Sequence, residues 1–561
     1  MVKWRSCMSK YTIGVDFGTL AVRALVVDVA NGRELACAVY NYPHAVMTEA
    51  LPDGTLLKPE WALQHPMDYV EGIYTVVPRA MEQAQICADD VIGLGIDFTS
   101  STSLPVDKNG TPLCLKEKFK SNPYAWPMLW KHHAAQDYAN RMTEVARERN
   151  ESFLQRCGGK ISSEMMFPRL WQIAVESPEV YEAADQFVEA GDWIIHQLTG
   201  SCICSMNPAS YKLFWTEEDG YPDDEFFSAL DSRLHDVTSK VGSTLLPLGS
   251  CGGKINEYGM RLTGLKKDTP VSVTCIDAHT ALPAAGVAEE GKMLLILGTS
   301  GAHLVLNEKE HEINGILCMA KDGMIPGWYA YEAGQSCCGD HFKWFIDQLV
   351  PTEYEVEAQK RQIGVHQLLT ERAEWLRPGQ SGLLALDWWN GNRSVLMDAE
   401  LSGLLIGMTL QTKPEEIYRA LIEATAYGTR EIVENFENAG IKIDEIYVCG
   451  GIAKKNPMLM QIYADVLRRT LKIVRSDQAN ALGTAIFAAV AAGKERGGYE
   501  SIQLAAHAMG GTERYEFHPI LCNSVVYDEL YAEYQKLHDL FGHGENDVMH
   551  RLRMIRHEQS K

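Results

Sequence analysis

The sequence predicts an α/β protein that contains two related domains. A strand–turn–strand unit with glycine and hydroxyl residues at its turn occurs at residues 13–29 and again at 291–306. A strand that leads through an acid or a Gly-Gly pair into a helix occurs in each half, at 271–287 and 446–471. Sheets flanked by helices are typical of α/β proteins, and 561 residues exceed what one hydrophobic core usually holds. The recurrence therefore predicts a duplicated domain with a boundary near residue 290.

The other elements follow from periodicity and composition. Apolar residues alternate with small or polar ones in the opening hairpin, and a third strand is expected at 34–40. Residues 66–87 and 125–155 favour helices, and a strand at 91–101 runs into an acid and several hydroxyls. A small-residue helix is expected at 480–493.

Composition and charge exclude several classes of protein. The net charge of −22 disfavours binding to nucleic acid, which needs basic patches, and to anionic membrane surfaces. No run of about 18 apolar residues is long enough to cross a bilayer. The first ten residues lack the apolar segment of a signal peptide, and translation can begin at Met1 or Met8. The fourteen cysteines follow no disulfide or zinc spacing, so we expect a protein of the reducing cytoplasm.

Three common phosphate-binding motifs can be compared with the sequence. Residues 286–293 approach a P-loop, but they end in Met293 and precede a strand instead of opening a helix. The turn at 16–19 opens a strand, which excludes a Rossmann fingerprint, and the protein-kinase motifs are absent. Two hairpin turns remain, whose backbone N–H groups and hydroxyls can surround phosphates.

Taken together, the motifs DFGT, IDAH, GTSG and strand–GG–helix resemble the superfold of sugar kinases, Hsp70 and actin, and within it the FGGY carbohydrate kinases. The segments MLWKHHAAQ, YEAGQSCCGDHF and ALDWWNGNRS are similar to the branch of this family that phosphorylates L-ribulose. The resemblance implies two duplicated actin/Hsp70-like (ribonuclease H-like) domains, at 11–290 and 291–545, with the active site in the cleft between them. The first domain would bind the sugar, and the second would bind adenosine.

The first turn carries the residue types that phosphoryl transfer requires. Asp16 is expected to hold Mg²⁺ through water, because Mg²⁺ keeps several waters and uses few carboxylates. Gly18 lets the backbone approach the phosphates, Thr19 supplies a hydroxyl, and Arg23 can reach phosphate oxygens. The alternative is an ordinary Asp-Gly hairpin with a surface arginine, which does not account for the matching second turn.

The GTSG turn is expected to hold the terminal phosphates, and the late Gly-Gly pair leaves room for adenosine. The family resemblance adds one more glycine beside the adenosine. The expected nucleotide-binding residues of the second domain are Gly298, Thr299, Gly339, Gly450 and Gly451. Asn456 begins the next helix, so it can cap that helix or contact the nucleotide, and both roles stay open.

Asp277 is the candidate general base. It directly follows an apolar strand, and in-line attack needs a carboxylate within hydrogen-bond reach of the sugar hydroxyl. An alcohol is too weak an acid to ionise beforehand, so its proton leaves as the O–P bond forms. Asp277 is also a candidate Mg²⁺ ligand. Its alternative role is the N-cap of a helix that begins near Ala278, and both roles can coexist. His279 is expected to be structural.

A polyol site needs several hydroxyl partners and an apolar wall. The family resemblance places these residues at the sugar: Asp97, Ser100, Trp126, Lys212, Asp277 and Glu332. His132 and His133 resemble a metal pair only superficially, because adjacent helical residues point to different faces.

The resemblance implies ATP-dependent phosphorylation of L-ribulose at its terminal hydroxyl, to L-ribulose 5-phosphate, in L-arabinose catabolism. D-Ribulose, D-xylulose, ribitol and glycerol are alternative substrates that the phosphate turns cannot separate. A nucleotide switch of the Hsp70/actin type is the alternative from another class, but it would need a peptide-binding or polymerising appendage. We therefore expect ATP, Mg²⁺ and a small sugar as ligands, with no nucleic acid and no membrane. A homodimer is compatible with the sequence, which carries no signal for oligomeric state.

Overall fold

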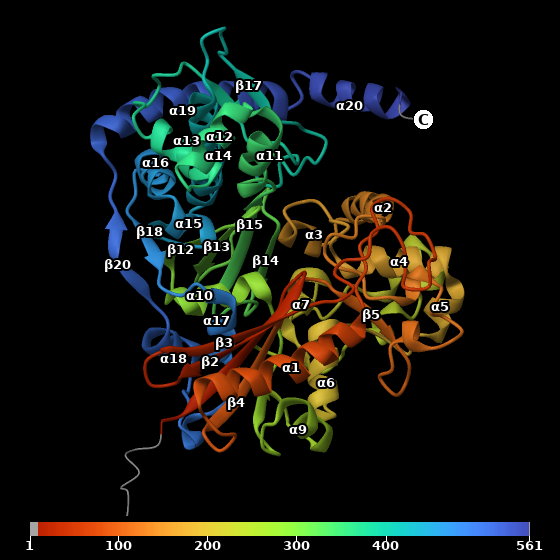
Figure 1. The fold of residues 1–561 in the computed structure, drawn as a ribbon. Coiled ribbons are helices and arrows are strands. Elements are labelled where there is room, and N and C mark those ends of the chain that lie inside the picture. The colour runs from red at the N-terminus through yellow and green to blue at the C-terminus, as the bar shows by residue number, and fades with distance from the viewer. Residues whose placement is uncertain (1–8, 560–561) are drawn as a thin grey trace, which may run out of the picture.

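The computed structural model describes residues 9–559 as two sheet-based domains with helices between and around them (Figure 1). The prediction about the start of translation lies outside these residues. The first sheet has the strand order β3-β2-β1-β4-β10-β9, with β11 beside β4. Its strands are β1 (Tyr11–Phe17), β2 (Ala21–Asp28), β3 (Glu34–Asn41), β4 (Val91–Phe98), β9 (Cys251–Lys254), β10 (Pro270–Ser272) and β11 (Cys275–Ile276).

The second sheet has the order β14-β15-β13-β12-β18-β19-β20. Its strands are β12 (Gly291–Leu297), β13 (Gly301–Asn307), β14 (Cys318–Lys321), β15 (Tyr329–Gln335), β18 (Ile443–Cys449), β19 (Leu471–Val474) and β20 (Thr512–Phe517).

The two sheets share one topology. In the first, β1 pairs antiparallel with β2 and parallel with β4. In the second, β12 pairs antiparallel with β13 and parallel with β18. The duplicated α/β fold predicted from the sequence is therefore confirmed. The exact domain ranges stay a prediction, because a helix from the second half of the chain packs on the first sheet.

Helices and short ribbons complete both domains. A lateral region between β4 and β10 contains the ribbons β5 (Ser103–Val106) with β6 (Gln186–Glu189) and β7 (Cys204–Ser205) with β8 (Leu245–Leu246). The helices of the first half are α1 (Pro66–Ala84), α2 (Gln136–Glu148), α3 (Phe153–Arg156), α4 (Met166–Glu176), α5 (Pro178–Ala183), α6 (Ala190–Thr199), α7 (Met206–Lys212), α8 (Asp224–Leu230), α9 (Glu257–Thr263) and α10 (Asp277–Ala285).

The second half adds one more ribbon, β16 (Leu384–Leu386) with β17 (Leu404–Ile406). Its helices are α11 (Gly339–Leu349), α12 (Thr352–Lys360), α13 (Val365–Ala373), α14 (Pro414–Asn438), α15 (Gly451–Lys455), α16 (Pro457–Leu467), α17 (Ala479–Ala492), α18 (Ile502–Met509), α19 (Leu521–Gly542) and α20 (Val548–Gln559).

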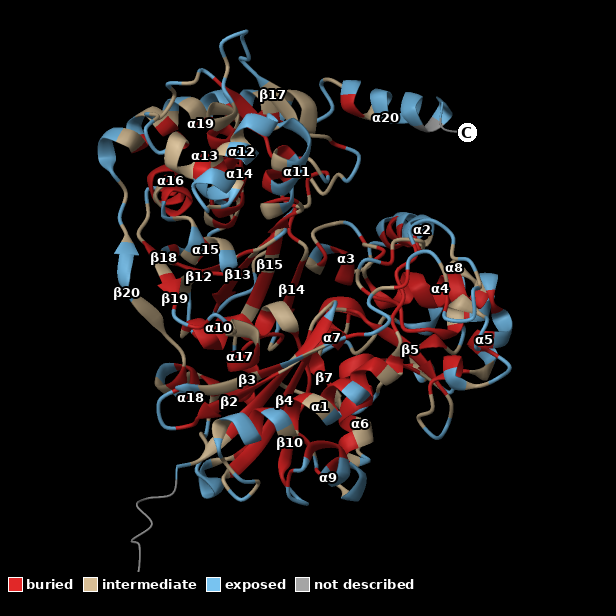
Figure 2. Cartoon of the chain, viewed as in Figure 1, coloured by how far each residue is buried: buried red, intermediate tan, exposed pale blue. Residues whose placement is uncertain are grey.

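Two helices, α10 and α17, connect the sheets. They pack against each other, α17 also lies on β1 and β4, and α10 also contacts β12. The approach of α17 is close enough that a side chain at Gly14 or Gly95 would collide with the carbonyl oxygen of Ala481 or Thr484. Figure 2 shows both sheets and these two helices as largely buried. This packing places the N-terminus of α10 between the two sheets.

The region 125–155 is less helical than predicted. Helix α2 begins only at Gln136, and residues 128–129 form extended contacts instead. Met128 bridges to Leu63 and Ser103, and the Leu129 N–H donates to the Ala62 carbonyl. Long-range backbone pairing therefore overrides the helical composition of this segment.

The expected lack of membrane spans and of disulfides can be compared with the structure of residues 9–559. In that part, no helix combines the length and apolar character that a bilayer span requires. None of its cysteines forms a disulfide.

We predict that Gly14→Ala destabilises the protein, because the new methyl group would meet the α17 backbone rather than a flexible side chain. Overpacking of this kind typically costs about 1–3 kcal/mol. The expected result is a lower urea midpoint by circular dichroism. Gly364→Ala is the control, since its Cβ would meet nothing within 4 Å, and a surface change of this kind stays within about 0.5 kcal/mol. Equal midpoints for the two variants would contradict the close packing.

Candidate active site

The first hairpin brings Asp16 and Arg23 together. They are register partners across β1 and β2, and Arg23 Nη1 donates to Asp16 Oδ2 over 2.7 Å. Burial would lower the pKa of the Arg23 guanidinium, but the Asp16 carboxylate outweighs this effect and raises it. The turn closes through the Gly18 N–H, which donates to the Ala21 carbonyl at 3.0 Å. Arg23 is therefore held at the turn by Asp16 rather than being a loose surface side chain.

Thr19 is held from two sides by residues that the sequence did not single out as functional. The indole Nε1 of Trp130 donates to Thr19 Oγ1 over 3.2 Å, and Gln64 Nε2 donates to the Thr19 carbonyl over 2.8 Å. Gln64 is buried, and its Oε1 accepts from the hydroxyl of Tyr69 at 2.8 Å. Trp130 lies in the MLWKHHAAQ segment, whereas Gln64 had no local signal.

Three carboxylates gather at the ends of β1, β4 and β11. Asp16 and Asp97 are register partners, and Asp97 lies within β4 rather than after it. The hydroxyl of Thr484, from α17, donates to Asp97 Oδ2. Burial, and after it the charge of Asp16, raises the pKa of Asp97 well above its usual range. Asp277 adds a third carboxyl to this group.

Asp277 is the first residue of α10. The N-cap is Ile276, and Asp277 Oδ1 accepts from the Ala278 N–H at 2.8 Å. Burial and then the charge of Asp16 raise the pKa of Asp277 to about 7, against the lowering effect of this hydrogen bond. Asp277 is therefore influenced by the charge of Asp16 from the first sheet and, less strongly, by that of Glu332 from β15.

The second hairpin forms a compact turn beside α11. The Gly298 carbonyl accepts from the Gly339 N–H at 2.9 Å, and the Thr299 carbonyl accepts from the Cys338 N–H at 2.8 Å. A Cβ at Gly339 would come within 2.7 Å of the Gly298 oxygen. The structure thus brings together Gly298, Thr299 and Gly339, although they are far apart in sequence.

The Gly-Gly pair after β18 joins the same region. Gly450 has φ of 105°, and a side chain there would collide with the Leu297 carbonyl, at the end of β12. A Cβ at Gly451 would meet nothing within 4 Å, so this position faces open space. Asn456 Oδ1 accepts from the Leu459 N–H at 3.0 Å, which makes it the cap of α16.

The predicted sugar residues Glu332 and Lys212 lie near Asp277. Glu332 Oε2 is 3.3 Å from His279 Nε2, and His279 Nδ1 is 2.9 Å from Asn207 Nδ2. Burial would raise the pKa of Glu332, but the hydrogen bond and charge of His279, together with Lys212, outweigh it and hold the pKa at about 2. Glu332 is therefore a carboxylate over the whole working pH range, and His279 orients it.

Two other predicted sugar residues, Ser100 and Trp126, differ in whether their side chains already form hydrogen bonds. The hydroxyl of Ser100 is buried and has no hydrogen-bond partner, so it is available to a ligand. Trp126 is buried, its Nε1 donates to the Lys120 carbonyl over 3.0 Å, and its ring lies edge-on to His65 at 5.2 Å.

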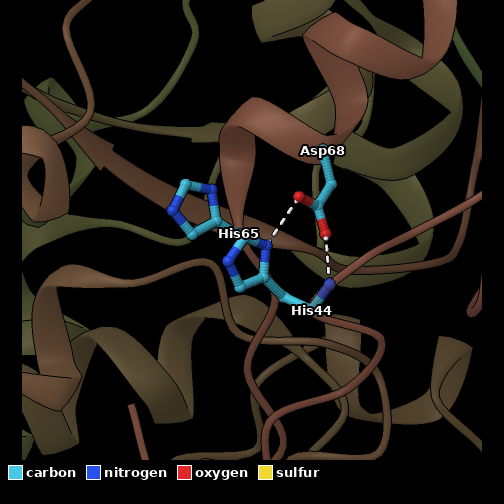
Figure 3. Close-up of side chains that lie close together, drawn as sticks. All are labelled: His44, His65 and Asp68. Carbon is cyan, nitrogen blue, oxygen red and sulfur yellow. Dashed lines mark hydrogen bonds and ion pairs between the residues drawn. The ribbon is translucent and has the colours of Figure 1, made fainter. Parts of the chain in front are cut away.

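His44, His65 and Asp68 form a separate polar group at the start of α1 (Figure 3). His44 Nδ1 lies 2.8 Å from Asp68 Oδ1, and His65 Nδ1 accepts from the Met67 N–H as the helix cap. The two rings stack with centroids 4.3 Å apart and planes 15° from parallel. Parallel rings direct their lone pairs along parallel lines rather than at one ion, so we assign this group to anchoring α1.

His132 and His133 also have separate partners. His132 Nδ1 accepts from the Ala62 N–H, and His133 Nδ1 is 3.1 Å from Ser163 Oγ. Burial, with Arg169, lowers the pKa of His132 to about 3, so its ring is neutral.

The sequence matches the FGGY family of carbohydrate kinases in both halves. Residues 11–283 match its N-terminal domain and residues 293–492 its C-terminal domain. A ribulokinase from Halalkalibacterium halodurans is 52% identical over 556 residues, which cover 99% of each chain. A ribulokinase from Anoxybacillus flavithermus is also 52% identical, with 97% of each chain covered.

A solved structure shows the same fold. The crystal structure of xylulose kinase from Rhodospirillum rubrum has a TM-score of 0.78, with 22% identity, and the match covers 94% of this chain and 98% of that one.

We predict that Gln64→Leu weakens binding of a non-hydrolysable ATP analogue by about 3- to 10-fold, as loss of one hydrogen bond to the Thr19 turn would do. Isothermal titration calorimetry measures the affinity. Tyr69→Phe is the matched control, because it removes the other bond of Gln64 and leaves the bond to Thr19 in place. Its affinity should stay within about twofold. Equal losses in the two variants would show that Gln64 acts only through general stability.

Proposed function

The chain belongs to the FGGY family of carbohydrate kinases, and on this premise we propose that it transfers the γ-phosphoryl group of ATP to the terminal hydroxyl of L-ribulose. The product is L-ribulose 5-phosphate, an intermediate of L-arabinose catabolism. One observation carries the proposal: Asp277 directly follows β11, which pairs with β4 at Asp97, and His279 of the same helix lies 3.3 Å from Glu332. The full-length similarity to ribulokinases supports L-ribulose as the substrate.

Asp277 acts as the general base. Its carboxylate accepts the proton of the attacking hydroxyl as the new O–P bond forms, and it orients that oxygen toward the phosphorus. The Ala278 N–H fixes Oδ1 of the carboxylate, so the side chain is held before the substrate arrives. A pre-positioned base lowers the entropic cost of reaching the reactive geometry.

The two turns hold the phosphates. The hydroxyls of Thr19 and Thr299 face the triphosphate, with the Arg23 guanidinium beside it. The Gly18 and Gly298 N–H groups close their own turns on the carbonyls of Ala21 and Ser300. The adenosine lies against the remaining glycines, which are Gly339, Gly450 and Gly451. Asn456 supports this region by capping α16, and its amide nitrogen, which donates to Thr370 Oγ1 over 3.4 Å, has a second N–H for the nucleotide.

The three acidic residues at the ends of β1, β4 and β11 suit a divalent cation. Burial, and after it the charge of Asp16, raises the pKa of Asp97 and of Asp277, and a bound cation would offset both effects. Asp16 and Asp277 would hold Mg²⁺, directly or through water, and Thr484 keeps Asp97 in place behind them. When bound, Mg²⁺ neutralises charge on the phosphate oxygens.

The sugar is held by hydroxyl partners from both domains. Glu332 accepts hydrogen bonds, Lys212 donates them, and the free hydroxyl of Ser100 can do both. Asp97 takes part in sugar binding as one of the three acidic residues that include Asp277. Trp126 forms part of the apolar wall of the sugar site.

A cytoplasmic location fits an enzyme that draws on ATP and whose described cysteines form no disulfides. A homodimer stays a prediction, which light scattering in solution can measure.

The substrate can be identified with a coupled assay of ADP release. MgATP is offered with L-ribulose, D-ribulose, D-xylulose, ribitol, glycerol or no sugar. The highest kcat/KM is expected with L-ribulose. A higher kcat/KM with another polyol would change the assigned substrate but not the assigned reaction. Slow ATP hydrolysis that no sugar accelerates would favour a nucleotide switch.

We predict that Asp277→Asn lowers kcat by about 10²- to 10⁴-fold, the usual contribution of a general base. The amide keeps the size of the side chain, so the dissociation constants for sugar and ATP should change by less than about fivefold. Rapid-quench kinetics and calorimetry measure the two effects. Retention of more than about a tenth of the turnover would exclude Asp277 as the base.

We predict that EDTA abolishes turnover and that Asp16→Asn raises the Mg²⁺ concentration for half-maximal activity by at least about tenfold. The reason is that the amide cannot supply the negative charge that a hard cation prefers. A Mg²⁺ titration at saturating ATP measures the shift. An unchanged half-maximal concentration would remove Asp16 from the metal site.

A further inference from the structure

The segment WWNGNRS lies directly on the strand that carries Glu332. Glu332 and Gly334 are two residues apart on β15, so they present the same face of the strand. A Cβ at Gly334 would be 3.2 Å from Cδ of Arg393, and the Gly334 N–H donates to Ser394 Oγ over 3.1 Å. The side chain of Arg393 therefore crosses the face of β15 that presents the Glu332 carboxylate.

Arg393 also reaches the first domain. Its Nη2 lies 3.1 Å from Oε1 of Glu164, which belongs to the loop before α4. The two side chains keep 26% and 18% exposure, so neither is sealed in the core. Next to this pair, Lys160 Nζ donates to the Met397 carbonyl over 3.0 Å. The two halves of the chain thus meet beside the predicted sugar residues, through an ion pair that remains partly accessible.

Contacts give the order of groups along the site. His279, two residues after Asp277 in α10, lies 3.3 Å from Glu332, and Arg393 crosses β15 at Gly334, two residues beyond Glu332. Burial would raise the pKa of Glu164, but Arg393 and then Lys212 outweigh it and lower that pKa. Arg393 acts on Glu332 as well. Glu332 therefore lies between the end of α10 that carries Asp277 and the Arg393–Glu164 pair.

We propose that Arg393 and Glu164 form the far end of the sugar site and bind the hydroxyls at the end of the pentulose opposite to the one that is phosphorylated. The proposal rests on the proposed function. The terminal carbons of an extended five-carbon chain are about 5 Å apart, given C–C bonds of about 1.5 Å. A guanidinium supplies only donors and a carboxylate only acceptors, so the pair can satisfy hydroxyls, which do both. The pair would then select substrates by length, because a three-carbon ketose lacks the carbons that carry those further hydroxyls.

The test compares L-ribulose with dihydroxyacetone, a three-carbon ketose, in Glu164→Gln and Arg393→Lys. Both variants keep side-chain size and weaken the paired charges or the fork geometry of the guanidinium. We expect KM for L-ribulose to rise at least about tenfold, while KM for ATP and kcat/KM for dihydroxyacetone stay within about twofold. The ratio of kcat/KM between the two sugars should therefore fall about tenfold.

Lys160→Met is the matched control, because it removes the neighbouring bond between the two halves and leaves the ion pair intact. Its sugar ratio should equal that of the unaltered protein. Equal losses on both sugars, accompanied by a lower melting temperature, would show that the pair only holds the domains together and would overturn the proposal. An unchanged KM for L-ribulose would overturn it as well.

The substrate preference of the unaltered protein distinguishes a failure of this proposal from a failure of the proposed function. If it prefers another polyol to L-ribulose, the substrate assignment fails, and the pair is then judged by the same ratio between that polyol and dihydroxyacetone. If it prefers L-ribulose and the ratio does not move in the variants, the substrate assignment stands and the pair has no part in binding.

Discussion

The close packing of α17 against the first sheet is the contact on which the rest of the structure depends. The helix backbone lies so near β1 and β4 that positions 14 and 95 have no room for a side chain. This approach lets Thr484 reach Asp97 in the middle of the sheet. Because α10 packs on both α17 and β12, the same contact sets where Asp277 lies between the two domains.

The acids of the candidate site have positively charged or donating partners on the proposed sugar side, and acidic neighbours on the proposed phosphate side. Glu332 and Glu164 face Lys212, Arg393 and His279, and both acids have a lowered pKa. Asp97 and Asp277 have a raised pKa, because burial and neighbouring carboxylates act in the same direction. This contrast is the basis for proposing that a cation with its phosphates binds at one end and a neutral polyol at the other.

Most of the residues expected to touch ligands are held by a second group of residues. Gln64 and Trp130 hold Thr19, Asn207 holds His279, which in turn orients Glu332, and Gly339 closes on the carbonyl of Gly298. These supports come from distant parts of the chain, and all but the Gly339 N–H act through side chains. They explain how loops and strand ends keep a fixed geometry before any ligand binds.

The sequence by itself determined the duplicated α/β fold, the two hairpin turns and the strand that leads into Asp277, because these depend on local periodicity and on glycine, acid and hydroxyl residues at fixed spacing. It did not determine that Asp97 lies inside β4, that residues 128–129 are extended, or that Asn456 caps α16. Nor did it indicate Gln64, Thr484 or the pairing of Arg393 with Glu164. Those features arise from contacts between residues far apart in the chain, and only the tertiary structure brings such groups within hydrogen-bond distance and removes the water that would otherwise solvate them.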